Sequence, residues 1–84
     1  MLQESFIQAA ADSKMLSEKP SNDILLKLYS LYKQGSEGDA EGEGPSNPFD
    51  FVAKAKHSAW AALQGTTKED AMQQYIDLVA ALKK

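Results

Sequence analysis

Two tyrosines and a lysine stand at helical spacing in the middle of the chain, in a pattern that suits a ring and an anion. Tyr29 and Lys33 are four residues apart, so on a helix their side chains lie on one flank, and Tyr32 lies at the edge of the adjacent apolar stripe. Aromatic rings can stack on a planar base, and lysine ammonium groups act as point charges for phosphate. The pattern is therefore typical of a site for a ligand that carries both a ring and a phosphate.

Lys56 is unusual because a helical wheel places it inside an apolar stripe, whereas its neighbour Lys54 points to the opposite side. A buried, unpaired ammonium group is costly, so Lys56 must reach solvent, pair with a carboxylate or face a ligand anion. The first of these outcomes is the common one. On a helical wheel Lys14 likewise falls between the apolar residues Ile7 and Ala10, although a lysine there also suits a helix C-terminus. Two such lysines favour the ligand interpretation.

Each tyrosine also has an ordinary structural interpretation. Tyr32 at a stripe edge can bury its ring and leave its hydroxyl in water, and Tyr75 lies in the middle of an apolar stripe, where a core position is expected. Convergence of several residues would favour a site instead. If the helices that carry them pack together, one groove would be lined by Tyr29, Tyr32, Lys33, Lys56 and Tyr75.

Other chemistries lack the residues that they need. The chain has no cysteine and a single histidine, His57, so no metal site is predicted. No nucleophile with a matching base and no glycine-rich phosphate loop is present, so we predict no catalysis. The net charge of −3 argues against a nucleic-acid partner, because a phosphate backbone needs a basic surface. A small phosphorylated ligand needs only two or three local cations.

Four predicted helices position these residues. Pro20 separates the first two, Ser21 is a good N-cap for the second, and Thr67 opens the fourth with a capping box that uses Asp70. Glycines at 35 and 65 are expected to end the second and third helices. The predicted ranges are about 3–16, 21–35, 49–63 and 67–82.

The segment 36–48 is predicted to be an exposed loop, because it holds three glycines and two prolines. A loop of this length is either functional or a long crossover between parallel helices. No strand pattern or internal repeat is present. The 84 residues therefore predict one domain, 1–84, of the all-α class: a four-helix bundle with a long crossover between the second and third helices. No signal peptide or membrane-spanning run is recognised, and we expect a cytoplasmic protein.

Taken in order along the chain, these residues resemble the acyl-CoA-binding proteins. The resemblance covers essentially the whole chain and does not depend on any single motif. The segments that carry it are Lys19-Pro20, Leu28 to Gln34, Gly38-Asp39, Lys54-Ala55-Lys56, Ala59-Trp60, Gly65-Thr66, Lys68 to Met72 and Tyr75-Ile76.

The resemblance implies a four-helix fold with an overhand connection between the second and third helices. It implies binding of long-chain acyl-CoA esters as a carrier and buffer, without catalysis and without a cofactor. No strong further apolar stripe argues for more than a monomer, and contacts with acyl-CoA-using enzymes and membranes are expected to be transient. The alternative hypothesis is a helical protein-interaction module that has lost ligand binding.

The resemblance also implies roles for individual residues. Tyr29, Tyr32 and Lys33 would surround the adenine and the ribose 3′-phosphate, and Lys56 would meet phosphate as well. Tyr75 would close the site. The remaining site residues are Lys14 at the rim, and Leu25 and Leu28 as acyl-chain contacts or core.

The sequence departs from the family pattern near the expected ligand path. The segment 36–48 is one residue longer than usual. Gly44 and Val52 stand where relatives often carry a basic residue, and His57 stands where an aromatic residue is common. Two expected cations are therefore absent. We expect binding to survive their loss, whereas the sequence does not determine the affinity or the chain-length preference.

Overall fold

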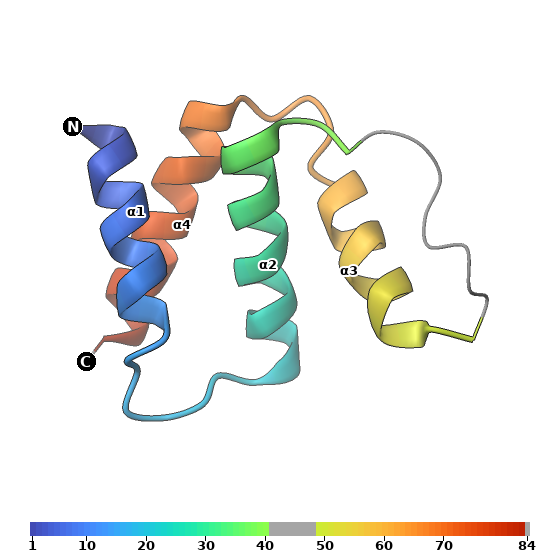
Figure 1. The fold of residues 1–84 in the computed structure, drawn as a ribbon, viewed down its shortest axis with the longest axis horizontal. Helices are drawn as coiled ribbons and strands as arrows, with labels where there is room; N and C mark the ends of the chain where they lie inside the picture. Colours follow the sequence, from blue (N-terminus) through green and yellow to red (C-terminus); the bar gives the residue numbers. More distant parts are fainter. Residues whose placement is uncertain (41–48, 84) are drawn as a thin grey trace.

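The computed structural model describes residues 1–40 and 49–83, and this part of the chain is all-helical, as predicted. Figure 1 shows the arrangement. The helices are α1 (Leu2–Ser13), α2 (Asn22–Glu37), α3 (Phe51–Ala61) and α4 (Lys68–Leu82).

Local side-chain caps begin three of the helices. The Ser21 hydroxyl accepts a hydrogen bond from the Ile24 N–H at 3.4 Å, and the Thr67 hydroxyl accepts one from the Asp70 N–H at 3.1 Å. The Asp50 carboxylate caps α3 in the same way, through the Ala53 N–H at 3.0 Å. These contacts satisfy N–H groups that have no partner inside the helix. They confirm the predicted starts of α2 and α4, and they fix the start of α3 after Asp50.

Two helices end earlier than predicted. The backbone leaves α1 after Ser13 rather than at residue 16, and the Met15 N–H bonds to the Asp12 carbonyl three residues back. After Ala61, at the end of α3, the backbone also forms hydrogen bonds between residues three apart. The change to three-residue hydrogen bonds closes the last turn. Lys14 therefore lies just beyond α1 and is exposed.

The predicted end of α2 at Gly35 is wrong. The helix continues to Glu37, and Gly38, with a φ of 86°, ends it. Gly35 is buried inside the helix, where a Cβ would lie 3.1 Å from Cζ of Phe6 and 3.2 Å from Cγ of Met72. The glycine therefore serves close helix packing, and the loop predicted to begin at residue 36 begins after α2. Most of that loop, residues 41–48, lies outside the described residues.

Helix α4 lies between α1 and α2, and α3 lies at the edge of the molecule against α2 (Figure 1). Helices α2 and α3 run in the same direction, so the chain must return along the length of the molecule between them. This agrees with the predicted crossover. The Asp12 carboxylate and the Lys83 ammonium pair at 3.0 Å and join the ends of α1 and α4.

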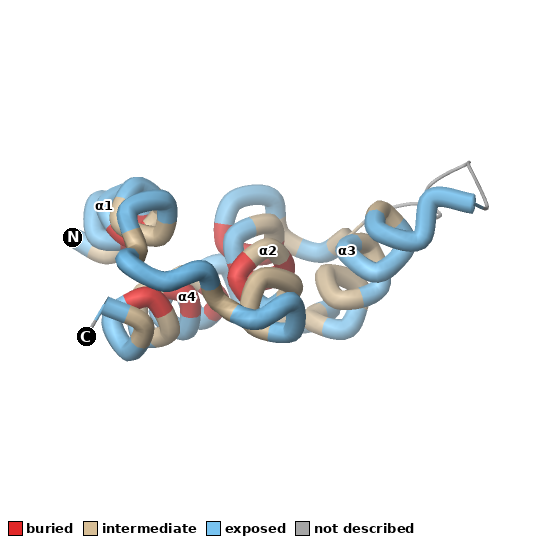
Figure 2. Tube along the Cα trace, turned by 90° about the horizontal axis from the view of Figure 1, so that it is seen from below, coloured by how far each residue is buried: buried red, intermediate tan, exposed pale blue. Residues whose placement is uncertain are grey.

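The buried core comes from three of the four helices. Figure 2 shows buried positions on α1, α2 and α4 and none on α3. The core residues are Phe6, Ala9, Leu28, Leu31, Ala71, Tyr75 and Val79.

Burial on α3 and α1 differs from the helical pattern at three positions. Lys56 lies in the apolar stripe of the wheel, but it is exposed, which is the common outcome for such a lysine. Among the described helices, α3 packs mainly against α2 and buries no residue fully. Ile7 is 61% exposed although it adjoins Phe6, since the buried face of α1 is formed by Phe6 and Ala9. Trp60 of α3 is only partly buried.

Candidate ligand-binding site

Three aromatic rings meet where α1, α2 and α4 pack together. Phe6 stacks on Tyr32 with ring centroids 5.3 Å apart, and Tyr75 meets both rings edge-on, at 5.3 Å from Phe6 and 5.8 Å from Tyr32. Tyr75 is buried, and its hydroxyl donates to the Ser13 hydroxyl at 3.2 Å. Tyr32 is 42% exposed, so one side of its ring is held by the core while the rest meets solvent.

An open pocket of about 290 Å³ adjoins these rings, and we call it the aromatic pocket. Its lining residues are Ala10, Ser13, Lys14, Leu28, Tyr29, Tyr32 and Tyr75. Five of the residues selected from the sequence therefore lie together. Leu28 and Tyr75 are also buried core residues, so they serve packing whatever the pocket binds.

A second pocket, of about 400 Å³, lies between α2 and the first turns of α3, and we call it the apolar groove. Its lining residues are Asn22, Leu25, Leu26, Phe51, Val52, Ala55 and Lys56. Leu25 and Lys56 were selected from the sequence, but Phe51 and Val52 were not. Both are strongly exposed, at 73% and 65%, on the face that completes the groove.

Two lysines place their ammonium groups over rings of the facing helix. Lys56 of α3 lies over Tyr29 of α2, with its Nζ 5.3 Å from the ring centroid, and Lys33 of α2 lies over Trp60 of α3 at 5.0 Å. Because Tyr29 lines the aromatic pocket and Lys56 lines the apolar groove, the two pockets adjoin at this pair. A ligand with a polar ring at one end and an apolar tail at the other would cross there.

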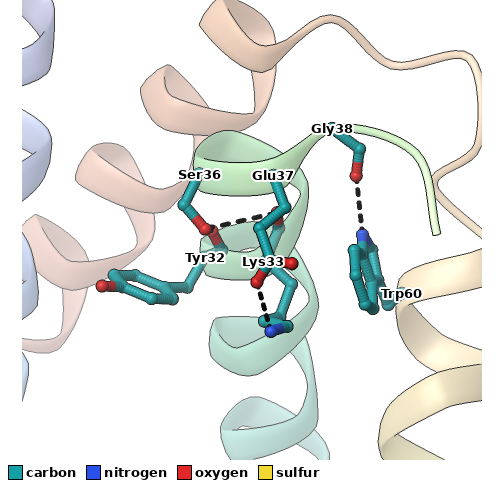
Figure 3. A network of polar contacts seen from close by, with 6 residues as sticks. All are labelled: Tyr32, Lys33, Ser36, Glu37, Gly38 and Trp60. Carbon is teal, nitrogen blue, oxygen red and sulfur yellow. Dashed lines mark hydrogen bonds and ion pairs between the residues drawn. The ribbon is translucent and has the colours of Figure 1, made fainter. Parts of the chain in front are cut away.

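Lys33 lies in neither pocket. Its ammonium group forms an ion pair with the Glu37 carboxylate one turn later on α2 (Figure 3). The hydrogen bond from Lys33 to Glu37 raises the pKa of Lys33 above its ordinary value. In Figure 3, Tyr32 and Trp60 lie on opposite sides of α2. Because its ammonium group lies over Trp60 of α3, Lys33 faces the α2–α3 side of the molecule. The predicted grouping of the three tyrosines and two lysines in one groove is therefore only partly correct.

Comparisons with known proteins fit this geometry. The profile of the family described as Acyl CoA binding protein matches residues 3–79. The chain belongs to the acyl-CoA-binding protein family. It is 49% identical over 78 residues to the Acyl-CoA-binding protein of Dictyostelium discoideum, which covers 93% of this chain and 92% of that protein.

A solved structure and an enzyme are also similar to this acyl-CoA-binding protein family member. The crystal structure of Oryza sativa Acyl-CoA-Binding Protein 2 superposes with a TM-score of 0.91 at 39% identity, covering 98% of this chain and 90% of that chain. Enoyl-CoA delta isomerase 2 of Rattus norvegicus is 46% identical over 80 residues, which cover 95% of this chain but 20% of that protein. The family resemblance inferred from the sequence is thereby confirmed.

Hydrogen bonds at the C-terminal end of α2 hold α2 and α3 together in this member of the family. The Trp60 indole N–H donates to the Gly38 carbonyl at 2.8 Å (Figure 3). The Asp39 carboxylate accepts from the Gly65 N–H at 2.9 Å and from the buried Gln34 amide at 2.8 Å. The bond from Gly65, and to a smaller extent the bond from Gln34, lowers the pKa of Asp39 below its ordinary value. They tie the α3–α4 turn to α2 and so fix the position of α3.

Within residues 1–40 and 49–83, no group of three or more histidine, cysteine or acidic residues could hold a metal ion. The same part of the chain contains no helix long and apolar enough to cross a bilayer. The groove residues Phe51 and Val52 had a signal in the sequence, since two apolar residues directly follow the Asp50 cap. Their exposure was not foreseen because α3 was expected to bury one face.

Proposed function

We propose that this chain binds long-chain acyl-CoA esters without covalent chemistry and serves as a carrier and buffer of these esters in the cytoplasm. Membership of the acyl-CoA-binding protein family supports this proposal. The observation that carries it is the junction of an aromatic pocket with an apolar groove at Tyr29 and Lys56. An acyl-CoA ester has the same division, with a phosphorylated nucleotide at one end and a hydrocarbon chain at the other.

Individual residues take the following roles in this proposal. Tyr29 and Tyr32 stack against or flank the adenine, and Lys33 and Lys56 meet phosphate groups as point charges. Tyr75 closes the inner wall of the aromatic pocket, and Lys14 stands at its rim.

The acyl chain occupies the apolar groove against Leu25, while Leu28 contacts the ligand from the core. Burial of apolar surface contributes about 25 cal/mol for each Å² removed from water. A long chain can therefore add several kilocalories even when it is only partly covered. Phe51 and Val52, which are exposed in the free protein, are covered in the complex and add to this gain.

In this proposal the chain itself catalyses no reaction. It acts as a monomer and passes its ligand to acyl-CoA-using enzymes or membranes through transient contacts. The likeness to one fifth of an enoyl-CoA isomerase fits a binding unit that can be joined to an enzyme.

Isothermal titration with palmitoyl-CoA tests the function, with free CoA and palmitate as controls. We expect tight one-to-one binding of the ester and much weaker binding of either half, because only the ester fills both pockets. A free-CoA release assay on the same mixture should stay at its background rate. Equal binding of palmitate and of the ester would contradict the roles given to the lysines, and no binding of the ester would refute the function.

A further inference from the structure

Glu37 pairs with Lys33, one of the two lysines that are proposed to meet a ligand phosphate. Within residues 1–40 and 49–83, the Lys33 ammonium pairs with the Glu37 carboxylate and lies over the ring of Trp60 (Figure 3). The side chain of Lys33 is 26% exposed and that of Glu37 is 52% exposed, so both are open to solvent and to an approaching anion.

The helix keeps the Glu37 carboxylate within reach of Lys33. Residues four apart on a helix lie one above the other, and α2 is continuous through both positions. A phosphate that meets Lys33 must therefore displace Glu37 from the ammonium group or share that group with it, and in either case it lies close to a like charge. Competition for the ammonium group and repulsion by the like charge both weaken anion binding. The contact between Lys33 and Trp60 does not exclude an anion as a further partner of the ammonium group.

We propose that Glu37 is a built-in competitor of the ligand phosphate, and that it sets the affinity of the site by holding Lys33 when no ligand is bound. This inference rests on the proposed acyl-CoA function and adds to it a residue that opposes binding. Glu37 lowers the gain from the phosphate next to Lys33, here the ribose 3′-phosphate, and leaves the gain from the acyl chain unchanged. The carrier therefore releases its ligand more readily than its pockets alone would allow.

The size of the effect follows from exposed electrostatics. Breaking a solvent-exposed ion pair and placing a phosphate near a carboxylate in a high dielectric together cost about three- to tenfold in affinity. Replacement of Glu37 by glutamine keeps the length of the side chain and removes its charge. We therefore expect Glu37→Gln to bind the ester about three- to tenfold more tightly than the wild type.

The experiment is titration of the wild type, Glu37→Gln and Asp77→Asn with palmitoyl-CoA and with its 3′-dephospho analogue. Asp77 is a matched control, because it is exposed on α4 and two residues beyond Tyr75, which directs it away from the aromatic pocket. Asparagine also retains the oxygen that accepts a hydrogen bond from Gln73. We expect Asp77→Asn to bind like the wild type, and the gain of Glu37→Gln to be largely lost with the dephospho ester.

The outcomes separate this inference from the function on which it rests. If the wild type binds palmitoyl-CoA and Glu37→Gln binds it no more tightly, the inference is overturned and the proposed function stands. An equal gain in Asp77→Asn, or an undiminished gain with the dephospho ester, would reduce the effect to net charge and also overturn it. If none of the three proteins binds the ester, the proposed function fails and the inference fails with it.

Discussion

Two lysines bridge the contact between α2 and α3, because each places its ammonium group over a ring of the other helix. A cation over a ring at an exposed site contributes about 0.5–1 kcal/mol. A hydrogen bond between a lysine and a charged phosphate contributes about 1.5–3 kcal/mol. A phosphate therefore outcompetes either ring, so the two ring contacts by themselves oppose ligand binding only weakly.

Lys56 and Lys54 provide a direct test at the residue scale. Both are exposed on α3, but only Lys56 lies over Tyr29 and lines the apolar groove. We expect Lys56→Ala to weaken palmitoyl-CoA binding by about 1–3 kcal/mol, because a charge-assisted hydrogen bond is lost. Lys54→Ala should bind nearly as the wild type does. Equal losses in the two variants, measured by titration calorimetry, would assign the effect to overall charge rather than to position.

The close packing of α1, α2 and α4 depends on Gly35. Phe6 approaches the backbone of α2 at this residue, and its ring is held between Tyr32 and Tyr75. The ring is buried, so it has little room to move away from an added atom.

We expect Gly35→Ala to lower the free energy of unfolding by about 1–2 kcal/mol. Overpacking of a filled core typically costs about 1–3 kcal/mol, and the better helix propensity of alanine returns part of that. Urea denaturation checks the value, with Ser36→Ala as the control at the exposed neighbouring position. A variant as stable as the wild type would mean that the Phe6 ring can shift at no cost.

Helix α3 is held differently from the other three helices. None of its residues is fully buried, and it contacts the rest of the molecule mainly through α2. Segments with few buried apolar contacts open at low free-energy cost.

Amide hydrogen exchange should therefore be faster in α3 than in α4 when no ligand is present. Palmitoyl-CoA should slow the exchange of α3 more than that of α1, because the acyl chain fills the groove that α3 shares with α2. The measurement is exchange of each amide with and without the ester. Exchange in free α3 as slow as in α4 would contradict the description of α3 as a weakly held helix.

At the scale of the whole molecule, Asp39 joins the end of α2 to the turn between α3 and α4. Its pKa is lower in the folded protein than its ordinary value, because the Gly65 N–H and the Gln34 amide stabilise the charged form. A carboxyl group with a lowered folded pKa contributes stability that is complete above its unfolded pKa, about 3.9. That stability is lost as the pH falls through the folded value.

We therefore expect the wild type to melt at a higher temperature than Asp39→Asn at pH near 7, and the gap to close below pH of about 4. The comparison isolates the charge, since asparagine keeps one acceptor oxygen at this position. Thermal unfolding at the two pH values measures the gap. A gap that stays constant or widens in acid would show that the Asp39 charge does not stabilise the fold.

Local sequence determined where three helices begin and which residue types could meet a phosphorylated ring. Ser21 and Thr67 cap the helices that they precede, and a cap depends only on the next three residues. The family could also be recognised from the sequence, because its motifs keep their order along the whole chain.

Tertiary structure decided where α2 ends and which residues are buried. Gly35 was interpreted as a helix stop because the sequence does not contain its contact with Phe6. That error placed Glu37 in a loop and hid its pairing with Lys33, although the two are four residues apart. The wheel placed Lys56 inside an apolar stripe because it reports the periodicity of one helix, whereas burial depends on how many neighbouring helices cover that stripe. Among the described helices α3 packs mainly against α2, and the groove between them is open to a ligand.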